Sequence, residues 1–328
     1  MLIIFKTITK LTIVVFTLGL LFSFSTLWYF SSDLPDYKIL SNYKPPISSR
    51  VHSGEGNLIA EYALQKRLFI PYDSIPKKII YSFLSAEDKN FFSHPCVDAK
   101  SITRAIIKNL QNIFSTKRLE GASTITQQVA KNFLLTNEVS IKRKIKEAIL
   151  AFRIEKAYSK ERIMELYLNQ IYLGEGTYGV AAASLEYFDK SVRDLDYEEA
   201  ALLAALPRAP STYNPYKSMK RATTRRNFVL KNLYENSYIN KAEYEDLKKK
   251  KIKTKKRKIK LLEEANFYSE EVRRIVSDTY GYDDLFKGGL SIRTPLNSYY
   301  QIEALDALRE GLEEYDRRHG WRGPITNT

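Results

Sequence analysis

The chain has 328 residues, so it is long enough for about two domains with a sizeable hydrophobic core. Its formal net charge is +14. The positive charge indicates an anionic partner, which could be nucleic acid, an acidic membrane surface or a phosphorylated substrate. The single cysteine, Cys96, excludes an internal disulfide, and the three histidines lack the spacing of zinc ligands. A metal held by His and Cys alone is therefore not expected.

An uncharged run of 22 residues, from 11 to 32, separates Lys10 from Asp33. A helix of this length could cross a hydrocarbon core of about 30 Å. Lys6 and Lys10 precede the run and Asp33 follows it, so the positive-inside rule places the N-terminus in the cytoplasm and the remainder outside. A cleaved signal peptide is the competing interpretation, which the length of the run disfavours. A membrane-anchored exterior chain weakens the nucleic-acid interpretation.

Beyond the predicted transmembrane anchor and its cytoplasmic tip (1–31), residues 32–72 are expected to form a linker and, over 50–62, two short strands about a Gly turn. Residues 73–247 carry apolar side chains at intervals of three and four, which predicts a compact helical domain. Gly174 is expected to end one of its helices. The expected helix starts are Ser140, Ser159, Asp196 with Glu199, and Asn240 with Glu243.

The region after the helical domain begins with a basic linker, residues 248–262. Its run KKKKIKTKKRKIK is too densely charged to pack, although attraction to acidic lipid headgroups is an alternative role. Residues 263–328 predict a helix over about 263–279, a strand over 288–296 and a helix over 298–315. We expect this region to be the start of a domain that the chain does not complete.

The stretch EDKNFFSHPCVD, residues 87–98, places two adjacent carboxylates beside a pair of Phe rings and a His. A Glu packed against aromatic carbon loses hydration, which raises its pKa toward the range where it can exchange a proton near neutrality. Glu87 is therefore the first catalytic candidate. The alternative is that Glu87 and Asp88 are solvated residues at a helix end.

The stretch GASTITQQVAKN, residues 121–132, runs from small and hydroxyl residues into a helix. Its backbone N–H groups, with Ser123, Thr124 and Gln127, could line a polar cleft, and Lys131 lies further along the same helix. A helix N-terminus of this kind suits an oxyanion such as phosphate. An ordinary capped amphipathic helix is the alternative.

The stretch RKIKEAILAFRIEK, residues 143–156, supplies further charges. Arg143 and Glu147 are four residues apart, so they share a helix face, and Lys144 adjoins them. If that face lines a cleft, it offers cations for a diphosphate beside a carboxylate; otherwise it is a weak surface ion pair. The aromatic residues near Asn169, in 160–184, are expected to pack rather than react.

In this order and spacing, the clusters resemble the family 51 glycosyltransferase domain of class A penicillin-binding proteins, the peptidoglycan polymerases, over roughly Arg50–Leu247. The nearly unbroken STITQQ is the most specific motif. The flanking GGLSIRTPLN and YDRRHGWRGP are similar to the 1A type from Gram-negative bacteria. The resemblance implies a mainly α, lysozyme-like fold with a membrane-facing lobe. The partly amphipathic stretch 102–114 could form part of that lobe, and a core helix is the alternative.

The resemblance also implies a reaction and roles for individual residues. Lipid II and a growing glycan strand would be joined with inversion at the anomeric carbon, releasing undecaprenyl diphosphate. Glu87 matches the general base, and Glu147 matches a second carboxylate that assists at the diphosphate. The matching basic positions are Arg104, Lys131, Arg143 and Lys144. The remaining positions expected to line or shape the site are Asp88, Phe91, Ser123, Thr124, Gln127 and Asn169.

The same resemblance implies a location in the bacterial inner membrane, with a single pass and a periplasmic catalytic domain. The expected partners are lipid II, the glycan strand and inner-membrane lipids, and could include other cell-wall synthesis proteins; nucleic acid is not expected. No cofactor is required, although Mg²⁺ or Mn²⁺ could bridge the diphosphate.

Several features depart from the family pattern. Cys96 replaces a usual Gly, and Val139 stands where Arg is frequent. A Ser followed three residues later by Lys occurs only at Ser41 and Ser74, and no Lys-Thr-Gly is present, so transpeptidation is not expected from this chain. The competing functions are a lysozyme-like enzyme that cleaves glycan and a catalytically silent membrane scaffold.

Overall fold

The computed structural model describes residues 2–31, 33–41, 43, 46–63, 65–94, 123–136, 138, 140–256 and 261–320. The chain divides into two compact units, residues 1–44 with 70–254, and residues 45–69 with 255–328. Each unit has a hydrophobic core of its own. Four of the predictions, on Cys96, Arg104, the stretch 102–114 and Val139, lie outside the described residues.

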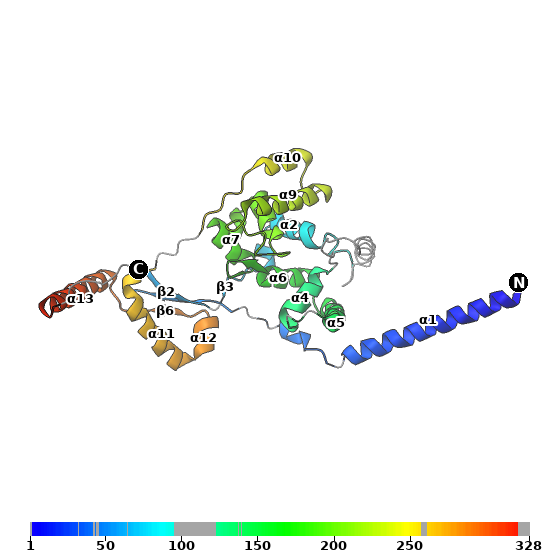
Figure 1. Ribbon diagram of the computed structural model, residues 1–328, viewed down its shortest axis with the longest axis horizontal. Coiled ribbons are helices and arrows are strands. Elements are labelled where there is room, and N and C mark those ends of the chain that lie inside the picture. The colour runs from blue at the N-terminus through cyan, green and yellow to red at the C-terminus, as the bar shows by residue number, and fades with distance from the viewer. Residues whose placement is uncertain are drawn as a thin grey trace. The chain divides into compact units, whose positions relative to one another are not determined.

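The first unit is mainly helical, which confirms the mainly α class predicted for this part of the chain (Figure 1). Helices α2, α8 and α9 pack on one another, and α4 packs on α5 and α6. The helices are α1 (Leu2–Ser31), α2 (Lys77–Glu87), α4 (Ile125–Leu134), α5 (Ile141–Ala157), α6 (Lys160–Gln170), α7 (Val180–Phe188), α8 (Tyr197–Ala205), α9 (Met219–Glu235) and α10 (Lys241–Lys249), with 3-10 turns at Tyr37–Leu40, Tyr72–Ser74 and Val192–Asp194.

Helix α1 covers the segment that was expected to be a membrane anchor. Within the residues that the structure describes, no helix combines the length and apolar character needed to cross a membrane. The anchor therefore stays a prediction. The end of α1 is tied to α5: the Arg153 guanidinium donates to the Ser31 hydroxyl, and Lys146 Nζ donates to Asp33 Oδ2 at 2.8 Å.

The predicted helix starts are confirmed. They could be predicted from the sequence because each depends on a capping side chain close to it in the chain. The Ser140 hydroxyl accepts the N–H of Arg143 at 3.1 Å at the start of α5, and the Ser159 hydroxyl accepts the N–H of Arg162 at 3.3 Å at the start of α6. Helices α8 and α10 begin with reciprocal capping boxes.

The expectation that Gly174 ends a helix is wrong. Helix α6 ends at Gln170, and Gly174 closes the strand β4 (Tyr172–Gly174), which pairs antiparallel with β5 (Thr177–Tyr178). Gly174 has a φ of +90°, and a Cβ there would lie 2.6 Å from the Tyr187 hydroxyl oxygen. The glycine is therefore required by a tertiary contact that its local sequence does not reveal.

Gly179, at the start of α7, offers a direct test of this hairpin. Its φ is +80°, and a Cβ would lie 2.7 Å from the carbonyl oxygen of Asn169. Gly179→Ala should therefore lower the free energy of unfolding by about 1–3 kcal/mol or more, measured by urea denaturation. Gly176→Ala is the matched control, because Gly176 has a φ of +72° with nothing within 4 Å of the added carbon. Equal losses in the two variants would contradict a steric role for Gly179.

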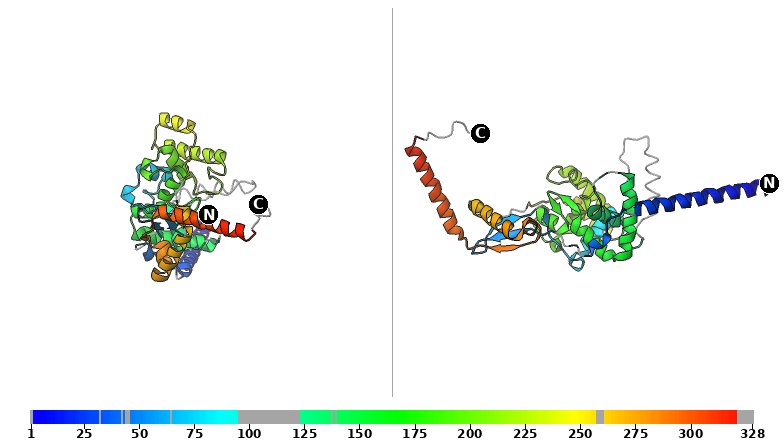
Figure 2. Two further views of the ribbon diagram at one scale, coloured as in Figure 1. Left: turned by 90° about the vertical axis from the view of Figure 1, so that its left-hand side faces the viewer. Right: turned by 90° about the horizontal axis from the view of Figure 1, so that it is seen from below.

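The second unit is built on a three-stranded sheet of order β2-β1-β6. Strands β1 (Ser49–His52) and β2 (Leu58–Tyr62) are antiparallel, as predicted, and β6 (Ser291–Arg293) is parallel to β1 and shorter than expected. Helix α11 (Asn266–Tyr280) lies along this sheet (Figures 1 and 2). The other elements of the unit are β3 (Lys66–Arg67), a 3-10 turn (Glu263–Ala265), α12 (Tyr282–Lys287) and α13 (Ser298–Arg318).

Candidate active site

Glu87 is the last residue of α2 and is half-buried. Gln128 of α4 donates its side-chain N–H to Glu87 Oε2 at 2.7 Å. Burial raises the pKa of the Glu87 carboxyl; the hydrogen bond from Gln128 and the positive charges of Arg225 and Arg208 oppose that rise, and the charge of Asp88 adds to it. A carboxyl with a raised pKa is suited to accept a proton near neutral pH.

Asp88 connects the end of α2 to the start of α4. Its Oδ2 accepts the backbone N–H of Ile125 at 3.2 Å, and its Oδ1 lies 2.7 Å from His94 Nε2. Phe91 is fully buried, and Lys160 Nζ lies 4.6 Å from the centre of its ring while donating to the His94 carbonyl at 2.9 Å. Asp88, next to Glu87, thus joins the end of α2 to the start of α4, and Phe91 belongs to the hydrophobic core of the unit.

The N-terminus of α4 is largely satisfied by the protein itself. The Thr124 hydroxyl accepts the N–H of Gln127 at 3.3 Å, and Gln127 Oε1 accepts the N–H of Thr124 at 3.0 Å. Together with the bond from Ile125 to Asp88, this arrangement occupies N–H groups that were expected to face an oxyanion. Of the two successive glutamines, Gln128 contacts Glu87 and Gln127 caps the helix.

The predicted charges of α5 form one cluster around a buried carboxylate. Glu147 is 1% exposed; its Oε2 lies 2.6 Å from Lys144 Nζ, and its Oε1 lies 3.1 Å from Arg143 Nε. The Arg143 and Glu147 atoms of that ion pair are off the hydrogen-bond direction. Two cations face one carboxylate, so the cluster keeps a net positive charge and can attract an anion.

Helix α4 links this cluster to Glu87. Lys144 Nζ also donates to the Ser123 hydroxyl, just before α4, at 2.9 Å. Lys131 lies one turn beyond Gln128 on the same face of α4, is half-buried, and forms no ion pair with any described residue. A carboxyl that can take a proton and three cations are therefore arranged about a single helix.

Asn169, which was expected to line the site, contacts the backbone of Ile70 and Glu165. Its side chain is buried, accepts the N–H of Ile70 at 2.8 Å, and donates to the carbonyls of Ile70 and Glu165, each at 2.8 Å. Its polar atoms are thus bonded to backbone, which favours a structural role.

Sequence reasoning missed four residues around Glu87: Gln128, Tyr167, Arg208 and Arg225. Tyr167 is buried, and its pKa is raised well above the ordinary value by burial and by the negative charges of Glu87 and Asp88. The helical phase of α4 could have identified Gln128. No sequence signal brings the two arginines to Glu87, because they follow it by more than a hundred residues.

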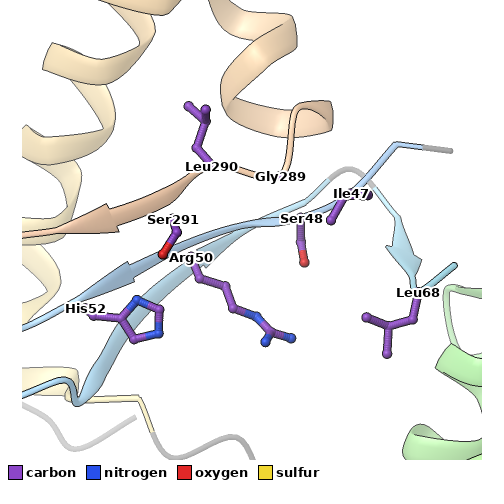
Figure 3. Close-up of a pocket in the computed structure, with 8 residues that line it drawn as sticks. All are labelled: Ile47, Ser48, Arg50, His52, Leu68, Gly289, Leu290 and Ser291. Atoms are coloured by element: carbon purple, nitrogen blue, oxygen red, sulfur yellow. The ribbon is translucent and has the colours of Figure 1, made fainter. Parts of the chain in front are cut away.

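A separate hollow of about 320 Å³ lies in the second unit (Figure 3). It is lined by Arg50 and His52 of β1 and by Ser48 just before that strand, and Arg50 is paired with Glu61 at 3.2 Å. It contains none of the predicted site residues.

Comparison with known proteins places the chain in a family. The family model described as Transglycosylase matches residues 55–234, and the chain belongs to that family. The chain is 47% identical over 302 residues to penicillin-binding protein 1A of Rickettsia felis, which covers 92% of this chain and 38% of the relative. Against penicillin-binding protein 1A of Escherichia coli it is 40% identical, covering 90% of this chain and 34% of the relative.

A solved structure shows the same fold. The crystal structure of penicillin-binding protein 1A from Haemophilus influenzae matches with a TM-score of 0.52 and 28% identity, covering 87% of this chain and 32% of that one. The chain thus spans less than half the length of the relatives that it matches. The predicted resemblance to a peptidoglycan glycosyltransferase is confirmed at the level of the family.

Proposed function

We propose that the protein is a peptidoglycan glycosyltransferase that joins lipid II to a growing glycan strand. In this reaction Glu87 removes the proton from the 4-hydroxyl of the acceptor N-acetylglucosamine while that oxygen attacks the anomeric carbon of the donor. The new carbon–oxygen bond forms opposite the bond to the diphosphate, so the configuration inverts from α to β. The observation that carries the proposal is that Glu87 is bonded to α4, the helix that also bears Lys131.

The leaving group would be undecaprenyl diphosphate, on which negative charge accumulates as the bond breaks. Fixed cations stabilise such charge most when they are already in place. Lys131, Arg143 and Lys144 are proposed to serve in this way, with Glu147 orienting the last two. Arg104 is proposed as a further cation on the donor side.

A divalent ion at the diphosphate is not well matched by this donor set. Mg²⁺ and Mn²⁺ prefer oxygen ligands. Both carboxylate oxygens of Glu147 already face cations, and the described residues include no group of three His, Cys, Asp or Glu that could hold a metal. We therefore derive no step through a metal.

We further propose attachment to the bacterial inner membrane, with the catalytic unit in the periplasm. The uncharged run 11–32, flanked by Lys10 and Asp33, supports this location. A lipid-linked substrate also requires an enzyme at the membrane surface.

Incubation of the purified protein with labelled lipid II tests the proposed function. We expect lipid-linked glycan polymer and released undecaprenyl diphosphate. New reducing ends from purified sacculi, without polymer from lipid II, would instead identify a cleaving enzyme. Binding of lipid II without either product would indicate a scaffold.

A further inference from the structure

Helices α2 and α9 run antiparallel beside each other. The rings of Tyr81 and Tyr238 stack with centres 4.2 Å apart. Ser85 lies one turn later on α2. Its carbonyl accepts a hydrogen bond from Asn232 Nδ2 at 2.8 Å, and the Ser85 hydroxyl accepts one from Asn236 Nδ2 at 3.1 Å. As α2 approaches its carboxyl end at Glu87, its partners therefore move toward the start of α9.

Arg225 lies on the same face of α9, two turns before Asn232. The antiparallel packing thus places the part of α9 that bears Arg225 beside the end of α2, where Glu87 is. The electrostatic coupling agrees with this placement, because the charges of Arg225 and Glu87 each favour the ionised form of the other.

Arg225 is a buried cation with few compensating contacts. It is 7% exposed, its guanidinium carbon lies 4.6 Å from the ring centre of Phe228 and 5.9 Å from that of Tyr213, and its Nε has no hydrogen-bond partner among the described residues. Burial lowers its pKa, as does the neighbouring charge of Arg208. A buried charge is costly unless it is paired, so a compensating interaction is expected.

We propose that Arg225 is a positioning residue for Glu87: its buried guanidinium, packed against aromatic rings, supplies a positive field that favours the carboxylate form of the proposed base. This inference rests on the proposed function and concerns a residue that need not touch substrate. Without such a field, the desolvated carboxyl would hold a proton more strongly, and a smaller fraction of molecules would be able to accept the proton of the acceptor hydroxyl.

Besides burial and Arg225, three other groups near Glu87 shift its pKa. Asp88 raises the pKa of Glu87, the hydrogen bond from Gln128 lowers it, and Arg208 lowers it. Tyr167 is a neutral phenol in this environment, since its own pKa is raised. Loss of the Arg225 charge should thus raise the pKa of Glu87 further and reduce the ionised fraction at any pH near that value.

The test compares the pH dependence of lipid II polymerisation in the parent, Arg225→Met and Arg225→Lys. Met keeps apolar contact with Phe228 but removes the charge, so the acidic limb of kcat/KM should move up by about one pH unit. Lys restores the charge and should return the limb toward that of the parent. Lys231→Met, which removes an exposed cation from the same helix, should leave the limb unchanged.

Two outcomes would overturn the inference while the parent remains active: an unchanged acidic limb in Arg225→Met, or an equal loss at every pH in both Arg225 variants. If the parent makes no polymer at any pH, the proposed function fails separately. The coupling is then tested without turnover, by the pH at which a water-soluble carbodiimide modifies Glu87, measured by peptide mass spectrometry. That pH should be higher in Arg225→Met, and no change would refute the coupling.

Discussion

Replacement of Glu87 by Gln should lower the rate of glycan polymerisation by about 10²–10⁴-fold, the contribution typical of a general base. The amide keeps the size of the side chain and can still accept the hydrogen bond from Gln128, but it cannot take the proton of the acceptor hydroxyl. Initial rates with labelled lipid II measure the effect. Because burial raises the pKa of Glu87, the parent should also lose activity on acidification at a pH above that of an exposed carboxyl.

Glu235→Gln is the control for this substitution. Glu235 lies on α9, is exposed, and pairs only with the exposed Lys231 among the described ion pairs, so its replacement should leave the rate unchanged. Unfolding curves of both variants should match that of the parent. A Glu87→Gln protein that polymerises at nearly the parental rate would show that another group accepts the proton.

Lys131→Met should lower kcat by about 10²–10³-fold, because removing one preorganised donor from a developing oxyanion has an effect of this size. Lys131 forms no ion pair with described residues, so its loss should not disturb folding, unlike the loss of Arg143 or Lys144 from the Glu147 cluster. Single-turnover rates with lipid II distinguish a slower chemical step from weaker binding.

A remote cation provides the comparison for Lys131. Lys241→Met removes a positive charge from the exposed start of α10 and should not change kcat. Lys131→Arg retains the charge with different geometry and should recover part of the rate. If Lys131→Met raises KM alone, the side chain binds substrate and transition state equally, and its proposed role at the leaving group is wrong.

The parts of the fold that were predicted correctly depend on neighbours in the sequence. Ser140 and Ser159 each cap a helix through an N–H three residues ahead, and the alternation of β1 follows the strand period. The expectation for Gly174 is wrong because a glycine that ends a helix and a glycine that faces a distant side chain look alike in sequence. The Tyr187 hydroxyl, which leaves no room for a Cβ at Gly174, belongs to the later helix α7.

In the candidate site, too, the contacts between residues close in sequence could be predicted, and those between distant helices could not. Arg143 and Glu147 were predicted as a pair because they are four residues apart on one helix, and the structure joins them. The electrostatic coupling between Arg225 and Glu87 depends on how α9 packs against α2, which is a property of the whole unit. Gln127, which was expected to line the cleft, instead caps the helix with Thr124, as the capped-helix alternative predicted, and the next residue, Gln128, contacts Glu87.

Two consecutive residues of the chain are hydrogen-bonded to α4 in different ways. Asp88 accepts the backbone N–H of Ile125, and Glu87 accepts the side-chain N–H of Gln128 one turn further on. The backbone that bears the proposed base is therefore fixed to α4 by Asp88, and its side chain is fixed to the same helix by Gln128. In the proposed reaction the carboxylate would thus stay in place between successive additions, and the glycan strand would have to move past it.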